Sequence, residues 1–120
     1  MPDVSTAIGP GFTELRRGVV EYCVLALLEE RDRYGLELVR TLSSLDGLVT
    51  SEGTVYPLLN RLRDSGMVTT HWRQTQDDRP RKYYAVTAAG KTAVARFRQD
   101  WVRFTEVVDR VLRTGREPGA

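Results

Sequence analysis

The sequence predicts a small, mainly α-helical (α+β) fold of one domain, in which three helices precede a β-hairpin and a long helix follows it. Apolar residues recur at helical spacing over residues 17–30, 34–45 and 51–66, alternate with polar residues over 67–74, and return to helical spacing after Thr87. A chain of 120 residues with 41% hydrophobic content can bury one core, which oligomerisation would supplement.

The first two predicted helices differ in how many of their sides are apolar. Residues 17–30, "RGVVEYCVLALLEE", are apolar nearly all round, which is typical of a helix buried on more than one side. We expect Cys23, the only cysteine, to be a buried, inert thiol there. Residues 34–45 carry a single apolar stripe, which consists of Tyr34, Leu38, Leu42 and Leu45.

The third predicted helix, "SEGTVYPLLNRLRDSG" at residues 51–66, contains Gly53 and Pro57, the two residue types least suited to a helix. Ser51 is a natural N-cap and Gly66 a natural C-terminal stop. We therefore place Gly53 and Pro57 near the helix start, where few amide donors are needed and the proline penalty of about 3 kcal/mol is reduced. The apolar stripe consists of Val55, Leu58, Leu59 and Leu62. The opposite face offers stacking, amide and guanidinium groups suited to base edges and phosphates, on Gly53, Tyr56, Pro57, Asn60 and Arg61.

The hairpin consists of "MVTTHWRQ", residues 67–74, and "KYYAV", residues 82–86, across the loop "TQDDRPR". Thr87 then caps the final helix. Three helices followed by a hairpin are the order of a winged helix-turn-helix with a two-stranded wing, in which the third helix reads the DNA major groove. The wing carries Arg79, Arg81 and Lys82.

Charge is unevenly divided along the chain. Residues 1–59 hold 5 basic and 9 acidic side chains, residues 60–103 hold 10 and 4, and residues 104–120 hold 3 and 3. The basic residues therefore gather around the end of the third helix and the wing, as a phosphate-binding surface requires. A solvated charged face without a partner is the alternative.

Catalytic chemistry has few candidate residues. His71 is the only histidine, and no acidic or cysteine ligands stand at metal-site spacings near it, so we expect it to be an exposed strand residue. No glycine-rich phosphate loop is present. We predict no catalytic residue, metal or cofactor. Because no segment has the length or composition of a membrane span or signal peptide, we expect a cytoplasmic protein without a membrane partner.

The final helix carries an apolar seam at alternating steps of three and four residues. Such a seam needs another helix to cover it, which favours a homodimer over packing on the small core of the same chain. A twofold dimer would place two third helices about 34 Å apart, so the operator should be an inverted repeat. The predicted dimer interface is Val94, Phe97, Trp101, Phe104, Val108 and Val111.

These patterns divide the chain into four segments. Residues 1–12 and 114–120 show no periodicity and are predicted to be mobile ends. Residues 13–86 form the predicted DNA-binding domain, and residues 87–113 the predicted dimerisation helix.

Three blocks together resemble the PadR family of bacterial transcriptional regulators: "RGVVEYCVLALLEERDRYGLEL", "SEGTVYPLLNRLRDSGMV" and "RPRKYYAVTAAGK". The resemblance spans roughly residues 15–112. It implies a homodimeric repressor that binds pseudo-palindromic operators and is released by small effectors. Because a single helix follows the wing, the chain is similar to the short branch of the family, which includes multidrug-sensing regulators of efflux genes.

The predicted DNA contacts come from the start of the second helix, the third helix and the wing. They are Tyr34, Ser51, Gly53, Thr54, Tyr56, Pro57, Asn60, Arg61, Arg79, Arg81 and Lys82.

The resemblance also implies an effector site for small aromatic or cationic compounds between paired tryptophans of the final helix. The matching residues are Leu15, Gly18, Tyr22, Phe97 and Trp101, although Tyr22 is bulkier than the family pattern implies. Three alternatives remain open: Trp101 as core filler, a regulator without an effector, and a winged-helix module that binds proteins instead of DNA.

Overall fold

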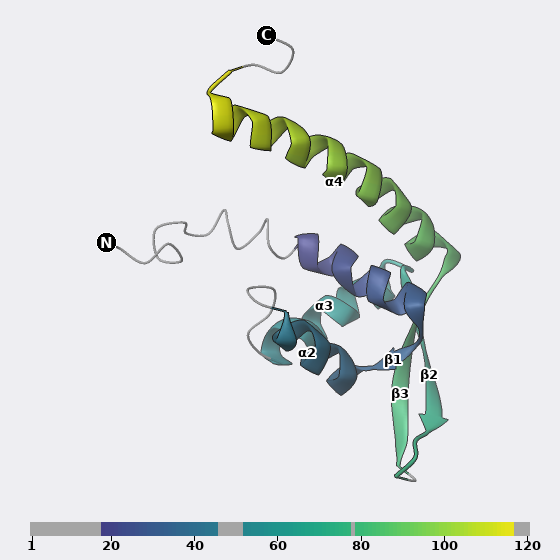
Figure 1. Ribbon diagram of the computed structural model, residues 1–120. Helices are drawn as coiled ribbons and strands as arrows, with labels where there is room; N and C mark the ends of the chain where they lie inside the picture. The colour runs from purple at the N-terminus through teal and green to yellow at the C-terminus, as the bar shows by residue number, and fades with distance from the viewer. Residues whose placement is uncertain (1–17, 46–51, 78, 117–120) are drawn as a thin grey trace.

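Three helices, a small sheet and a long fourth helix follow one another along the chain (Figure 1). A computed structural model describes residues 18–45, 52–77 and 79–116. The first helix covers residues 18–30 of the described chain. It is followed by β1 (Arg33–Tyr34), α2 (Gly35–Ser44), α3 (Glu52–Asp64), β2 (Val68–Gln74), β3 (Pro80–Val86) and α4 (Ala88–Thr114). The predicted mobile N-terminus, Leu15 and Ser51 lie outside the described residues.

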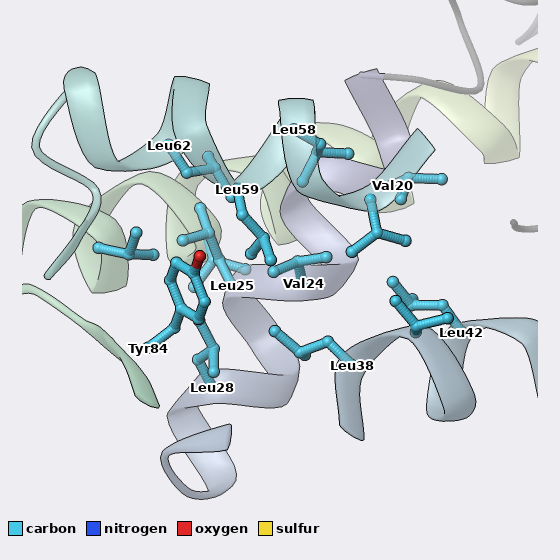
Figure 2. Packing of buried hydrophobic residues seen from close by; sticks show 14 residues of the cluster. Val20, Val24, Leu25, Leu28, Leu38, Leu42, Leu58, Leu59, Leu62 and Tyr84 are labelled. Atoms are coloured by element: carbon cyan, nitrogen blue, oxygen red, sulfur yellow. The ribbon is translucent and has the colours of Figure 1, made fainter. Parts of the chain in front are cut away.

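The core forms where the apolar sides of the first helix, α2 and α3 meet (Figure 2). Val24 of the first helix, Leu38 of α2 and Leu59 of α3 are all fully buried. Tyr84 of β3 joins the same cluster from the sheet. Each buried aliphatic side chain of this size stabilises the fold by about 1.5–3 kcal/mol, so this cluster holds the three helices together.

Cys23 of the first helix is less buried than expected, and Arg33, just after this helix, is a buried charge. Cys23 is only half-buried, yet burial still raises the pKa of its thiol, which favours the unreactive protonated form. Arg33 in β1 is buried although it is charged. Its Nε donates a hydrogen bond to the Leu27 carbonyl at 3.3 Å, and its guanidinium lies 3.2 Å from the Glu30 carboxylate. Arg33 thereby satisfies a carbonyl near the end of the first helix.

The end of α3 is set by Gly66. The Met67 amide donates to the Leu62 carbonyl at 2.9 Å, and the Gly66 amide donates to the Arg63 carbonyl at 3.0 Å. Gly66 has φ of 79°, a left-handed conformation that glycine adopts without strain. This is a Schellman motif, and it confirms the role expected of Gly66.

Pro57 lies near the start of α3, as predicted, but the expected reduction of the proline penalty is wrong. Because α3 already includes Glu52, Pro57 lies in the second turn, where a residue would normally donate its amide to the carbonyl of Gly53. Proline has no amide hydrogen and its ring crowds that carbonyl, so the helix start does not remove the penalty. The buried stripe below, which includes Leu58 and Leu59, holds this part of the helix in place.

The sheet has three strands in the order β1-β3-β2, whereas the sequence predicted a two-stranded wing. Arg33 and Tyr34 pair antiparallel with Tyr84 and Tyr83. A strand of two residues is too short to produce an alternating pattern, so only its pairing with β3 reveals it. The predicted hairpin is formed, with β2 residues 68–74 opposite β3 residues 86–80. Pro80 and Arg81, which were predicted in the loop, belong to β3.

The start of α4 is fastened to the end of α3. Thr87 caps the helix as predicted, because its hydroxyl accepts a hydrogen bond from the Gly90 amide at 3.1 Å. The same hydroxyl donates to the Gly66 carbonyl at 2.6 Å. A Cβ built on Gly90 would lie 2.3 Å from the Met67 carbonyl oxygen, so this contact has no room for any side chain.

Val94 corrects the predicted dimer seam. It is 2% exposed and belongs to the core cluster of its own chain, because the N-terminal part of α4 packs against the other helices. The C-terminal half of α4 extends away from the rest of the molecule as a long arm (Figure 1). It ends at Thr114, where Gly115 adopts φ of 67° and caps the helix.

Candidate nucleic-acid interface

The outward face of α3 is exposed to solvent. Tyr56, Pro57 and Asn60 are all exposed, whereas the residues of the apolar stripe on the opposite face are buried. Gly53, Thr54 and Arg61 are exposed as well. The structure therefore brings together the residues predicted for α3, apart from Ser51, which lies outside the described part of the chain.

Tyr56 is held against the start of α2 by a close contact with Gly35. A Cβ built on Gly35 would lie 2.6 Å from Cε1 of Tyr56, so the ring rests where a side chain would otherwise stand. Burial raises the pKa of the Tyr56 phenol, with a further increase from the nearby Glu52 carboxylate. The phenol therefore stays protonated at neutral pH, and its O–H can donate to a phosphate or to a base acceptor. Gly35 was not among the predicted site residues, because a glycine that only makes room for a neighbour has no pattern in the sequence.

Three cations of the wing lie over aromatic rings. The guanidinium of Arg81 is 4.7 Å from the ring centroid of Tyr34, and the Lys82 Nζ is 5.5 Å from that of Tyr84. Arg73, which the sequence patterns did not indicate, is 3.9 Å from the ring centroid of Tyr83. Such contacts contribute about 0.5–1 kcal/mol at exposed sites and limit the freedom of each cation. The wing therefore presents positive charge in defined positions.

The loop between β2 and β3 is organised around Asp77. Its carboxylate accepts hydrogen bonds from the Thr75 hydroxyl and the Arg79 amide, and lies 3.5 Å from the Arg81 guanidinium. The Thr75 bond is the main reason why the pKa of Asp77 is lowered, and the Arg79 and Arg81 contacts add to this. Asp77 therefore stays ionised and offsets part of the charge of Arg81. The side chain of Arg79 is exposed.

Arg61 turns away from the other predicted contacts. Its guanidinium donates two hydrogen bonds to Oε1 of Glu21 in the first helix, at 2.9 and 3.1 Å. Since an exposed ion pair of this kind contributes only about 0–1 kcal/mol, a phosphate can compete with Glu21 for Arg61.

A cleft of about 250 Å³ connects α3 to the wing. Tyr56 lines it from α3, Leu36 from α2, and Lys82 from β3. The remaining lining residues are Tyr34, Gly35, Arg81 and Tyr84. The cleft therefore joins the outward face of α3 and the cationic wing into one surface, which we call the basic face.

A second cleft, of about 450 Å³, lies between the first helix and α4. The ring of Phe97 stacks there between two other aromatic rings. Its centroid is 4.1 Å from that of Tyr22, with an interplanar angle of 6°. It is 5.6 Å from the centroid of Trp101, with an interplanar angle of 22°. Gly18, Val19, Asp100 and Phe104 complete the lining. The structure thus brings together four of the five residues predicted for an effector, the fifth being Leu15, outside the described chain.

Other kinds of site find no support in the described residues. Residues 18–45, 52–77 and 79–116 contain no cluster of three or more His, Cys, Asp or Glu side chains that could hold a metal ion. Among these same ranges, no helix has the length and apolar character needed to cross a membrane.

A helix-turn-helix core, an exposed third helix and a cationic β-wing define a winged-helix DNA-binding protein. Residues 24–96 match the transcriptional regulator PadR-like family, and the chain belongs to this family. The family comprises transcriptional regulators, not enzymes, so its function is DNA-binding regulation of transcription.

Individual relatives agree in fold and length. The chain is 33% identical over 86 residues to transcriptional regulator Rv3488 of Mycobacterium tuberculosis, covering 72% of this chain and 78% of that protein. A PadR-like transcriptional regulator from Bacillus cereus superposes with a TM-score of 0.77 at 29% identity, covering 82% of this chain and 96% of the other. A PadR family transcriptional regulator from Eggerthella lenta superposes with a TM-score of 0.74 at 31% identity, covering 92% and 96%.

Proposed function

We propose that the protein is a homodimeric, sequence-specific repressor that acts in the cytoplasm, binds an inverted-repeat operator and is released by a small aromatic or cationic effector. The observation that carries the DNA-binding part is the basic face. Tyr56 and Asn60 supply groups that can read base edges, and Arg81 and Lys82 supply phosphate contacts beside them.

Homodimer formation is supported by the apolar surface on α4. Phe104, Val108 and Val111 are exposed on the same side of the helix, at 58%, 36% and 43%. An apolar stripe of this length on a helix that extends from the domain needs a partner, and a second copy of the same helix fits its repeat of three and four residues. Two copies related by a twofold axis would present two α3 helices to successive major grooves.

Effector binding is supported by the cleft beside the same surface. Stacked aromatic rings favour a planar ligand, and the carboxylate of Asp100 in the lining favours a cationic one. Because Trp101 belongs both to this cleft and to the exposed stripe of α4, a ligand there would contact the dimer interface and alter the spacing of the two α3 helices.

The first prediction separates phosphate contacts from base contacts. Arg81→Ala or Lys82→Ala should weaken binding to operator and random DNA alike and reduce the slope of log affinity against log salt by about 0.9 for each phosphate that is no longer neutralised. Tyr56→Ala or Asn60→Ala should cost about 1–3 kcal/mol on the operator and little on random DNA. Fluorescence anisotropy with an operator selected from a random duplex library, measured over a series of salt concentrations, tests both.

Thr69→Ala is the control for this experiment. Thr69 is an exposed residue of β2 near the base of the hairpin, and its replacement should leave both affinities unchanged. If all four variants showed the same decrease in affinity on operator and random DNA, the assignment of base contacts to α3 would be wrong. A parent protein without salt-dependent DNA binding would instead support a protein-interaction module.

The second prediction concerns Trp101. Planar aromatic cations should bind the parent protein and lower its operator affinity, through stacking and cation–π contacts of about 0.5–2 kcal/mol each. Trp101→Ala should abolish both responses and leave DNA binding in place. Calorimetry with a planar cationic dye measures binding, and anisotropy of labelled operator measures release.

Trp72 provides the internal control, because it lies in β2, outside the cleft. In the absence of DNA its fluorescence should not respond to the dye. Equal dye affinity of parent and Trp101→Ala would assign Trp101 to packing alone and favour a regulator without an effector.

A further inference from the structure

The most exposed aromatic side chain of the described residues is Trp72, in the wing. Trp72 is 70% exposed, and its indole makes no ring or cation–π contact with any other residue that the structure describes. It lies on β2, one of the two edge strands of the sheet. An apolar side chain of this size in water gains nothing for the fold, which indicates an external partner.

The side of the hairpin on which Trp72 stands is defined by the strand register. Trp72 is directly opposite Lys82, and the next pair on the same side is Thr70 with Tyr84. Tyr84 is buried in the core, so this side faces the helices at the base of the hairpin. Figure 1 shows that the far end of the hairpin projects beyond the helices. In the other pair, Trp72 is exposed and Lys82 is half-buried.

The charges around Trp72 indicate what kind of partner it meets. Lys82 and Arg81 line the cleft that leads to α3, and no carboxylate contributes to this lining among the described residues. Two carboxylates near the hairpin, Glu37 and Asp77, line a different cleft together with Arg73. A third, that of Asp32, lies 3.5 Å from Nε2 of His71, which alternates to the opposite side of β2 from Trp72. A second wing placed against Trp72 would bring like charges together, whereas a polyanion would be attracted.

We propose that the Trp72 indole packs against the deoxyribose wall of the DNA groove next to the one that α3 occupies, as an apolar contact beside the phosphate contact of Lys82. This inference rests on the proposed DNA binding and extends it to a residue type that charge patterns do not identify. The flat indole buries apolar area against the sugar, and its Nε1–H can donate to a neighbouring phosphate oxygen. The contact reads no base, so it adds affinity for any duplex.

Two measurements test this inference with a short mixed-sequence duplex. Trp72→Ala should lower the affinity about tenfold at fixed salt, because apolar area is no longer buried, without changing the salt slope. Lys82→Ala should lower the affinity and also the salt slope. Trp72→Phe, which keeps an aromatic ring, should retain most of the affinity, and Thr69→Ala should match the parent. Thermal unfolding of each variant confirms that it is folded.

Acrylamide quenching follows the indole directly. The sequence contains two tryptophans, and DNA should shield one of them in the parent. In Trp72→Phe the shielding should disappear although the duplex is still bound, because the remaining Trp101 lies on α4, away from the wing.

Failure of the inference is distinguishable from failure of the proposed function. If Trp72→Ala bound the duplex like the parent while Lys82→Ala bound it more weakly, Trp72 would have no DNA contact and the repressor proposal would stand. Shielding of Trp72 by a higher concentration of the protein itself, or by anionic vesicles but not by DNA, would also overturn the inference. A parent protein that binds no duplex would overturn both.

Discussion

Val108→Asp should convert the proposed dimer into a monomer or unfold it. Val108 lies in the middle of the exposed apolar stripe of α4, between Phe104 and Val111. A carboxylate buried in the centre of that seam, twice per dimer and without a positive partner, costs several kcal/mol. Sedimentation velocity of the folded protein at micromolar concentration measures the change in mass.

Val102→Asp is the matched control on the same helix. Val102 is 55% exposed, and it lies on a different side of α4 from the stripe, where it lines a shallow surface with Arg98, Gln99, Arg103 and Glu106. The same substitution there should leave a folded dimer. A Val108→Asp protein that sediments as a folded dimer would contradict the proposed seam, and a Val102→Asp protein that dissociates would place the interface on the other side of α4.

Gly90→Ala should destabilise the protein by about 3 kcal/mol, an overpacking effect at the upper end of the usual range. The Cβ would lie 2.3 Å from the Met67 carbonyl oxygen and 2.7 Å from Cγ2 of Val86. Because the first of these contacts is with backbone, the turn that joins α3 to β2 must move, and with it the hydrogen bond from the Thr87 amide to the Met67 carbonyl. Thermal unfolding at fixed protein concentration should show a melting temperature lower by about 10 °C.

Whether Gly90→Ala lowers or raises the stability of the protein distinguishes an effect of packing from an effect of helix propensity. By propensity alone, Gly90→Ala would stabilise α4 by up to about 1 kcal/mol. Ala89→Gly, the reverse change at the exposed neighbouring position, should therefore be only mildly destabilising. If Gly90→Ala melted at or above the temperature of the parent, the close contact between α4 and Met67 would be disproved.

Local patterns predicted most of the fold. The apolar stripe of α3, the glycine stop at Gly66 and the Thr87 cap each depend on residues close together in the chain, and each is confirmed by burial or by a hydrogen bond. Periodicity also predicted the hairpin of β2 and β3, because alternation of apolar and polar residues is typical of a strand. These features are decided by interactions of short range, which a single sequence records.

The candidate site was predicted less completely, because its geometry depends on residues distant in sequence. Exposure of Tyr56 and Asn60 followed from the stripe of α3, but the ion pair that takes Arg61 to Glu21 joins positions 40 residues apart. The stacking of Arg73 on Tyr83 likewise needs the hairpin to be formed. Charge counts identified the basic segment without showing which cations face α3.

Helical spacing in the sequence established that α4 has an apolar side, but only the packed chain decided how that side is used. Val94 and Trp101 repeat at the same spacing, yet Val94 is buried in its own domain while Trp101 remains 38% exposed. The difference arises because the core of three short helices ends before the long helix does. Periodicity describes which residues share a face, whereas burial depends on whether the rest of the chain reaches that face.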